Sequence, residues 1–290
     1  MSKHRALIIG CGRMGAGRDH KSPWVYTHIE AYRAFPERVE VVGFVDRVQA
    51  RAEWAAEKWG VPYAGDHFAD ALVQCKPDII SICTPPSDRE EFFRVLAGRN
   101  DIKGVWCEKP AGVKYGLLLG ATHREIPVQV DYIRRFDEQH IAISTRRAVM
   151  DPDMASRAHL FWFGALDMHT VAHVTDLAAF WRIAPTNLCF IPFHGPSLYI
   201  LREPGPGAGR YLNWTDTSFV GGGVSDGFME RGLENLLRHI DTTIPRLVGN
   251  PDPPAPWPLL SPLCRKTQKT EQQAQDIVDG AYYGSHEQCE

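Results

Sequence analysis

The residues with the clearest chemical meaning form a glycine string near the start of the chain. Gly10, Gly12 and Gly15 are spaced as G-x-G-x-x-G, with Arg13 and Met14 before the last glycine, and the string directly follows a short apolar run. The first glycine permits a tight turn, the second lets a pyrophosphate approach the backbone, and the third lets a helix pack close to the strand. Free N–H groups at the start of that helix bind anionic phosphates. The string therefore predicts a dinucleotide-binding loop rather than an ordinary glycine-rich turn.

An acidic residue ends the second apolar run, where the adenosine ribose of a bound dinucleotide is expected. The Asp46 carboxylate can accept hydrogen bonds from ribose hydroxyls, and it repels a 2′-phosphate. This favours NAD over NADP. The neighbouring Arg47 keeps NADP open, because a guanidinium can hold such a phosphate.

Two further turns follow apolar runs and complete the expected cofactor edge. Cys83, Thr84 and Pro85 follow the third run, and Glu108 and Lys109 follow the fourth. Ligands of open parallel sheets bind at the carboxyl ends of the strands. A lysine at such an end is placed where a nicotinamide and its substrate would meet.

The segment between the glycine string and Asp46 is longer than usual. Asp46 lies 31 residues after Gly15, whereas about 20 is typical. The excess falls in Ala16–Tyr26, after which Thr27 and Glu30 form a capping-box pattern that predicts a helix starting at Thr27. We consider two interpretations, a surface insertion and a flap over the cofactor or substrate.

The first 132 residues alternate strand and helix, which predicts βαβ units around a parallel sheet. A weaker strand is expected through Tyr63. The other expected strands are Ala6–Gly10, Val39–Asp46, Asp78–Cys83, Gly104–Cys107 and Val128–Tyr132, and the expected helices are Val48–Trp59, His67–Gln74, Arg89–Ala97 and Tyr115–Thr122.

The pattern changes after Arg134 to α+β with a mostly antiparallel sheet. The expected helices there are Asp137–Met150, Met168–Trp181 and Thr267–Tyr283, and the expected strands are Ala158–Phe163, Leu188–Phe193, Leu198–Leu201 and Tyr211–Trp214; the proline-rich Pro251–Pro262 is expected to be irregular. We predict an α/β protein with a Rossmann dinucleotide-binding domain at 1–133. A substrate-binding and oligomerisation α+β domain with an open sheet is predicted at 134–290, its final helix able to pack back on the first domain.

Composition excludes several other classes of protein. The 290 residues carry a formal net charge of −3, which provides no general attraction to nucleic acid or to an anionic membrane. No apolar stretch is long enough for a membrane span, and the start does not resemble a signal peptide. The odd number of cysteines, without a C-x-x-C pair, indicates reduced thiols and a cytoplasmic location.

The motifs together resemble the glucose–fructose oxidoreductase / inositol dehydrogenase / rhizopine catabolism (Gfo/Idh/MocA) family. The matching pieces are GCGRMG, VVGFVD, SICTPP, CEKP, the RRF at 134–136 and the His-x-x-Asp at 173–176, collinear over roughly residues 5–185. The resemblance implies NAD(P)-dependent hydride transfer on sugars, cyclitols or their derivatives. It also implies a homodimer or homotetramer.

The resemblance also implies roles for individual residues. Lys109 matches the family's catalytic lysine, and Thr84 and Pro85 match the loop along the nicotinamide ribose. Arg135 matches the arginine near the substrate site, and His173 matches the histidine commonly assigned as general acid/base. A histidine suits that role because its unperturbed pKa is near neutral.

The chain departs from the family pattern at the residue four positions before this histidine. His169 stands where the family has Asp, and Asp167 lies two residues earlier. We take Lys109, His173 and His169 as catalytic candidates, and the same three with Arg135 as substrate-binding candidates. An H-x-x-x-H pair could bind zinc, but with no third ligand nearby in the sequence we expect no metal.

These observations predict an NAD(P)-dependent oxidoreductase acting on a secondary alcohol or ketone carbon of a small sugar-like molecule. Two alternatives remain open: an imine or non-sugar ketone reductase, and a regulatory protein that binds NAD without turnover.

Overall fold

A computed structural model of the chain divides into two compact units. The first contains residues 1–136 and 226–252, and the second contains 137–225 and 253–290. The structure describes residues 2–21, 25–111, 126–138, 140–141, 144–145, 158–163, 167–191, 198–202, 211–214, 227–241 and 247–248. The expected segments Tyr115–Thr122, Pro251–Pro262 and Thr267–Tyr283 lie outside these residues, as does most of Asp137–Met150.

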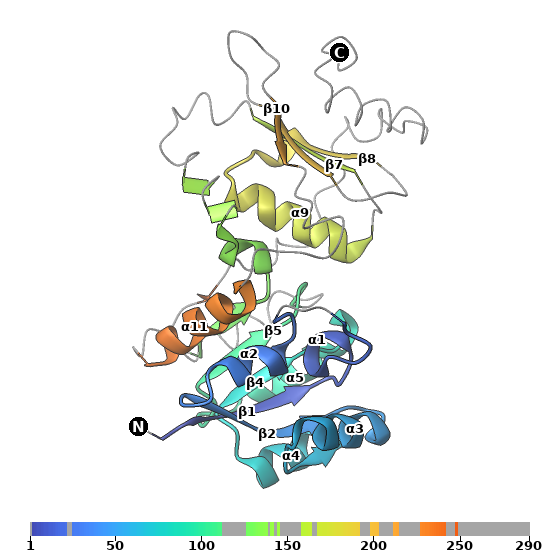
Figure 1. The fold of residues 1–290 in the computed structure, drawn as a ribbon, viewed down its shortest axis with the longest axis vertical. Coiled ribbons are helices and arrows are strands. Elements are labelled where there is room, and N and C mark those ends of the chain that lie inside the picture. Colours follow the sequence, from blue (N-terminus) through green and yellow to red (C-terminus); the bar gives the residue numbers. More distant parts are fainter. Residues whose placement is uncertain are drawn as a thin grey trace. The chain divides into compact units, whose positions relative to one another are not determined.

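The first unit is built on a seven-stranded sheet in which every recorded pairing is parallel (Figure 1). The strand order is β11-β6-β5-β4-β1-β2-β3. Strands β1 to β3 are added toward one edge of the sheet and β4 to β6 toward the other, so the strand order switches between β1 and β4. The strands are β1 (His4–Ile9), β2 (Val39–Val45), β3 (Ala64–Gly65), β4 (Ile79–Ile82), β5 (Gly104–Cys107), β6 (Val128–Val130) and β11 (Leu247–Val248). This is a Rossmann-type sheet, as predicted.

Helices lie on both faces of this sheet. They are α1 (Arg13–Ala16), α2 (His28–Ala34), α3 (Gln49–Trp59), α4 (Phe68–Cys75), α5 (Arg89–Leu96) and α11 (Phe228–Asp241), with a 3-10 turn η2 at Ile133–Phe136. Trp106 of β5 contacts the rings of His28 and Tyr32 on α2, at 4.0 and 5.7 Å between centroids. Leu7 of β1 points to the other face, where Cys75 of α4 lies.

Helix α11 joins the first unit from far along the chain, which the sequence pattern did not indicate. It buries Leu233, Leu236 and Leu237, all 0% exposed. Gly104 of β5 accommodates it, because a Cβ there would stand 2.5 Å from Ile240 Cδ1. The small residue on β5 thus lets the helix pack closely against the sheet.

The second unit carries a four-stranded sheet in the order β10-β9-β7-β8. The strands are β7 (His159–Phe163), β8 (Leu188–Ile191), β9 (Leu198–Arg202) and β10 (Tyr211–Trp214). β7–β9 and β9–β10 pair antiparallel, and β7–β8 pair parallel. Helix α9 (Met168–Phe180) lies beside this sheet (Figure 1), and its Leu177 belongs to one buried cluster with Leu160 and Trp162 of β7.

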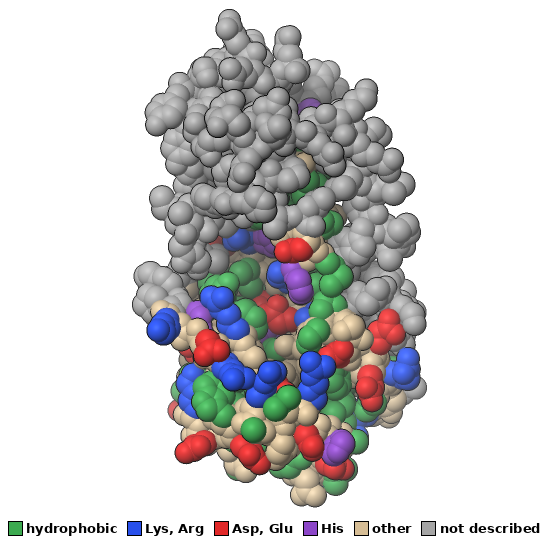
Figure 2. Space-filling model, turned by 90° about the vertical axis from the view of Figure 1, so that its right-hand side faces the viewer, with side chains coloured by type: hydrophobic (Ala, Val, Ile, Leu, Met, Phe, Trp, Pro, Cys, Tyr) green, Lys and Arg blue, Asp and Glu red, His purple; other side chains and the backbone are tan. Residues whose placement is uncertain are grey.

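The face drawn in Figure 2 carries Lys and Arg side chains interspersed with Asp and Glu over the described residues. No helix within the described ranges is long and apolar enough to cross a membrane.

Candidate functional site

The glycine string forms a tight turn between β1 and α1, in which Gly10 and Gly15 lie against other backbone atoms and Gly12 faces open space. Gly10 has φ +94°, and a Cβ there would lie 2.8 Å from both the carbonyl carbon and oxygen of Cys83. A Cβ on Gly15 would collide with the Gly10 carbonyl oxygen. Gly12 has nothing within 4 Å of its Cβ position, so its surroundings have room for a ligand. Arg13 and Met14 follow it in the first turn of α1, and the Arg13 side chain is exposed.

Asp46 ties the end of β2 to the glycine string. Its carboxylate accepts the Cys11 N–H at 2.9 Å through Oδ2 and the Val48 N–H at 2.9 Å through Oδ1. The group is largely buried, whereas the Arg47 side chain is exposed. The carboxylate is therefore held at the tip of β2, next to the turn that would take the pyrophosphate.

The turn after β4 lies directly against this loop. The Cys83 N–H donates to the Ile9 carbonyl at 2.7 Å, which continues the β1–β4 pairing beyond the strands. Thr84 follows, and its Oγ1 is buried without a hydrogen-bond partner; Pro85 is exposed. Open space at Gly12 and an unsatisfied buried hydroxyl at Thr84 both fit a dinucleotide that lies along this edge.

A buried arginine holds the turns after β4 and β5 together. Arg89, 2% exposed, donates from Nε to the Thr84 carbonyl at 2.8 Å and from Nη1 to the carbonyls of Glu108 and Pro110. Its Nη2 reaches the Thr84 carbonyl at 2.5 Å. One guanidinium thus fixes the main chain on both sides of Lys109.

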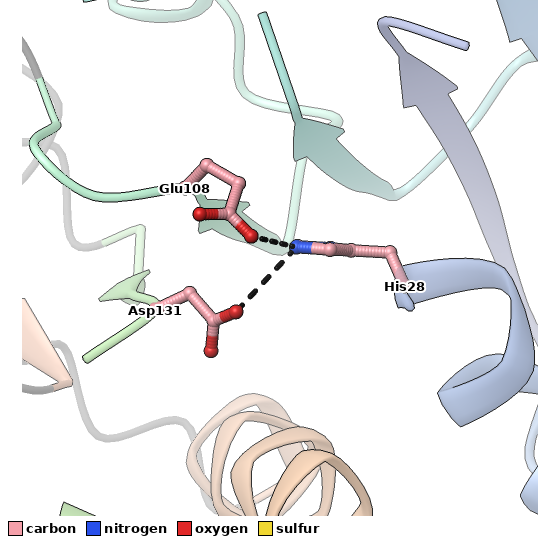
Figure 3. A group of neighbouring side chains, drawn as sticks. All are labelled: His28, Glu108 and Asp131. Carbon is pink, nitrogen blue, oxygen red and sulfur yellow. Dashed lines mark ion pairs between the residues drawn. The ribbon is translucent and has the colours of Figure 1, made fainter. Parts of the chain in front are cut away.

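Lys109 follows Glu108 at the end of β5 and is half-buried. The Glu108 carboxylate lies in a buried group with His28 and Asp131 (Figure 3). Burial alone would raise the pKa of Glu108, but His28, Lys109 and Arg89 hold it below its usual range. The pKa of Asp131 is well above its usual range because of burial and the neighbouring Glu108 carboxylate.

The long segment after α1 returns to this edge of the sheet. α1 ends at Gly17, and α2 begins with the predicted capping box, in which Thr27 Oγ1 accepts the Glu30 N–H at 3.3 Å and Glu30 accepts the Thr27 N–H at 3.1 Å. Tyr26 stacks on His20 at 5.0 Å between ring centroids. Burial and the Glu108 carboxylate raise the pKa of Tyr26. Part of the segment therefore lies near the Glu108 turn.

The remaining candidates lie elsewhere. Arg135 is half-buried in η2, in the first unit. His169 and His173 are both on α9 in the second unit; His169 is exposed, and His173 meets the Trp162 ring edge-on at 6.1 Å between centroids. Asp167 is the N-cap of this helix and accepts the Thr170 N–H at 2.7 Å, so it holds the helix start.

Three residues of this edge escaped the sequence reasoning. The sequence pattern marks Arg89 only as the first residue of an expected helix, and it gives no role to His28 or Asp131. A signal existed for two of them. His28 directly follows the capping residue Thr27, and Asp131 is an acid inside an otherwise apolar strand pattern.

Comparison with known families supports this interpretation of the first unit. Residues 4–116 match the family GFO_IDH_MocA, described as "Oxidoreductase family, NAD-binding Rossmann fold". No curated protein sequence matches the chain closely enough to count as a relative.

Solved structures share the fold over most of the chain at low sequence identity. A probable dehydrogenase from Thermotoga maritima has 13% identity and a TM-score of 0.59, covering 84% of this chain and 91% of its own. A myo-inositol dehydrogenase from Corynebacterium glutamicum has 15% identity and a TM-score of 0.57, covering 84% and 90%. An oxidoreductase from Agrobacterium radiobacter, in complex with NAD+, L-tartaric acid and magnesium, has 12% identity and a TM-score of 0.52, covering 83% and 88%.

The Arg89 contacts predict a specific loss of stability. Arg89→Met removes the guanidinium donor from three carbonyls, of which those of Glu108 and Pro110 are in buried hydrogen bonds. Each buried group left unsatisfied costs about 1–3 kcal/mol. We expect the free energy of unfolding to fall by at least about 2 kcal/mol in urea titrations. Arg94→Met, on the exposed side of the same helix, is the matched control and is expected to change it little. Equal stability of the two variants would contradict the role of Arg89.

The position of Asp46 predicts a change in cofactor preference. Asp46→Ser removes the carboxylate that repels a 2′-phosphate, so the affinity for NADPH relative to NADH should rise at least about tenfold, or about 1.4 kcal/mol. Fluorescence titrations with both cofactors measure the ratio. Asp66→Ser, after the neighbouring strand β3, is the control. An unchanged ratio in Asp46→Ser would reject the assignment.

Three observations agree on the first unit: its strand order, the steric roles of its three glycines, and the family match. Residues 4–116 of this chain therefore match the model of the Gfo/Idh/MocA oxidoreductase family, and the first unit has the Rossmann-type sheet that this family's description names.

Proposed function

We propose that the protein is an NAD-dependent dehydrogenase or reductase. It would transfer a hydride between the nicotinamide and the secondary alcohol or ketone carbon of a sugar, a sugar derivative or a cyclitol. The observation that carries the proposal is Lys109, which follows β5 at the carboxyl edge of the NAD-binding sheet, with the main chain on both sides of it held by Arg89.

The chemistry assigns this lysine an electrostatic role. Bound NAD+ supplies the hydride acceptor at nicotinamide C4. When the substrate carbon loses a hydride, its hydroxyl must also lose a proton, and negative charge develops on the oxygen. The Lys109 ammonium stabilises that charge, or donates a proton in the reverse direction. Arg89 acts as a positioning residue, since it contacts only main-chain carbonyls in its recorded hydrogen bonds.

His173 is the proposed acid/base. Its imidazole accepts the substrate proton during oxidation and returns it during reduction. The family resemblance supports this assignment, together with the half-buried position of the ring beside Trp162 on α9. His169, one helical turn earlier and exposed, is proposed as a substrate contact, as is Arg135.

The names of structurally similar proteins support the substrate class. One is a myo-inositol dehydrogenase, and another was crystallised with L-tartaric acid. Both compounds carry several hydroxyl groups. We further propose that the second unit binds the substrate and joins copies of the chain into a homodimer or homotetramer, and that the protein acts in the cytoplasm.

One assay distinguishes this proposal from two alternatives, an imine or non-sugar ketone reductase and a regulatory protein that binds NAD without turnover. A panel of cyclitols, free sugars and nucleotide-linked sugars is offered with NAD+, and NADH formation is followed. Turnover with a polyol supports the proposal. Turnover only with imines or non-sugar ketones and NADH favours the second class. Tight NADH binding without turnover of any compound favours a regulatory protein.

The lysine assignment predicts a loss of turnover without a loss of cofactor binding. Lys109→Met should lower kcat by about 10²-fold or more, because it removes charge stabilisation in the transition state. NADH affinity should change little. Lys76→Met makes the same change in an exposed lysine that precedes β4, at the opposite edge of the sheet, and should retain activity. Near-normal kcat in Lys109→Met would reject the assignment.

The histidine assignment predicts a pH dependence with a definite sign. A base must be unprotonated, so kcat/KM for alcohol oxidation should fall as the pH drops and the imidazole becomes protonated. His173→Asn should abolish this step, whereas His67→Asn, a surface control, should keep it. Profiles of kcat/KM against pH for the three proteins measure this, and an unchanged step in His173→Asn contradicts the role.

A further inference from the structure

A buried imidazole and two buried carboxylates converge at the carboxyl ends of β5 and β6. The side chains of His28, Glu108 and Asp131 are 0%, 10% and 2% exposed. One ligand-type atom from each lies within 4.8 Å of the other two, and Figure 3 shows the three groups pointing toward one another. Within the part of the chain that the structure describes, no other group of three or more such residues has this geometry.

The sheet register places the two carboxylates opposite each other. Cys107 pairs with Val130, and the Asp131 N–H donates to the Cys107 carbonyl at 2.7 Å. Glu108 and Asp131 therefore extend the parallel pairing by one residue and share a face of the sheet. Like charges in such positions repel, so ionisation of both carboxylates is favoured only when positive charge lies nearby.

A hydrogen bond to the other ring nitrogen orients the His28 imidazole. His28 is the first residue of α2, whose start the capping box fixes. Its Nδ1 hydrogen-bonds Ser81 Oγ at 3.0 Å, and Ser81 Oγ in turn hydrogen-bonds the Tyr32 hydroxyl at 2.8 Å. This leaves Nε2 facing the carboxylates. Metal-bound histidines are typically held through their other ring nitrogen in this manner.

The three facing atoms do not satisfy one another. His28 Nε2 lies 3.6 Å from Glu108 Oε1 and 3.8 Å from Asp131 Oδ2, beyond hydrogen-bond range. All three atoms are buried without a hydrogen-bond partner. Two atoms that bind one tetrahedral zinc ion at about 2.0–2.2 Å are about 3.3–3.6 Å apart. The two separations from His28 Nε2 are at or just above this range, and both are too long for a direct hydrogen bond.

The two carboxylates of this group have few positive charges near them among the recorded contacts. Two carboxylates share a buried place with one imidazole, so ionising both of them would put two negative charges out of contact with water. Arg89 lies close to this group, but all its recorded hydrogen bonds go to carbonyl oxygens rather than to the two carboxylates.

We propose that His28, Glu108 and Asp131 bind one divalent transition-metal ion, with zinc the best match to one nitrogen and two oxygen ligands. The ion joins the start of α2 to the ends of β5 and β6 and so braces the turn that carries Lys109. This site differs from the expectation of no metal. The three ligands are far apart in the sequence, and no spacing motif links them. The proposal does not depend on the substrate or on turnover.

Metal content and calorimetry test the site without an activity assay. The full chain is stripped with a chelator and titrated with ZnCl₂, and bound zinc is counted by mass spectrometry after dialysis. We expect about one zinc per chain and at least about 100-fold weaker binding in Asp131→Asn. Asp66→Asn is a matched control, because Asp66 Oδ1 lies 3.8 Å from His67 Nε2 on the exposed surface, and it should bind as the unmodified protein does.

Each outcome decides the proposal. No stoichiometric zinc in the unmodified chain, or equal zinc in Asp131→Asn and Asp66→Asn, overturns it and leaves a shared proton as the means of neutralising the two acids. If Asp131→Asn does not fold, X-ray absorption of the zinc-loaded unmodified chain decides instead. A first shell of nitrogen and oxygen with one imidazole supports the site, and a sulfur shell, from the chain's cysteines, rejects it.

Discussion

The close approach of two backbone turns at the carboxyl ends of β1 and β4 is the constraint on which the site depends. Gly10 lies so near the Cys83 carbonyl that no Cβ fits between them. This contact places the open space at Gly12 and the unsatisfied Thr84 hydroxyl on one edge. Arg89 then links the turn after β5 to the turn after β4, because it donates hydrogen bonds to the carbonyls of Thr84, Glu108 and Pro110. These main-chain hydrogen bonds place Lys109 at the same edge of the sheet as the glycine string and Thr84.

Three buried ionisable side chains lie next to the turn that carries Lys109. Glu108 and Asp131 directly follow the adjacent strands β5 and β6, His28 Nε2 faces both carboxylates, and Lys109 and Arg89 are the nearby cations. Because burying unpaired charges is costly, the state of this group affects the stability of the Lys109 turn. A bound metal ion or a shared proton would each reduce the repulsion between the acids.

Much of the first unit could be predicted from the sequence, because its information is local. Apolar runs ended by glycine or aspartate mark β1 and β2, and the Thr27–Glu30 pair marks the start of α2. What could not be predicted depends on contacts between distant residues. Helix α11 buries Leu236 against β5 although more than a hundred residues separate them, and Arg89 is a buried clamp only because two turns meet around it. The roles of His169 and His173 remain predictions, since they rest on the family resemblance.

A crystal structure of the full chain with NAD+ bound tests the central claim most directly. The measured quantity is the position of the dinucleotide relative to Gly12, Thr84 and Lys109. The account predicts the pyrophosphate over Gly12 and the nicotinamide ring beside Thr84 and the Lys109 amine. A dinucleotide whose nicotinamide lies away from the Lys109 turn would contradict it.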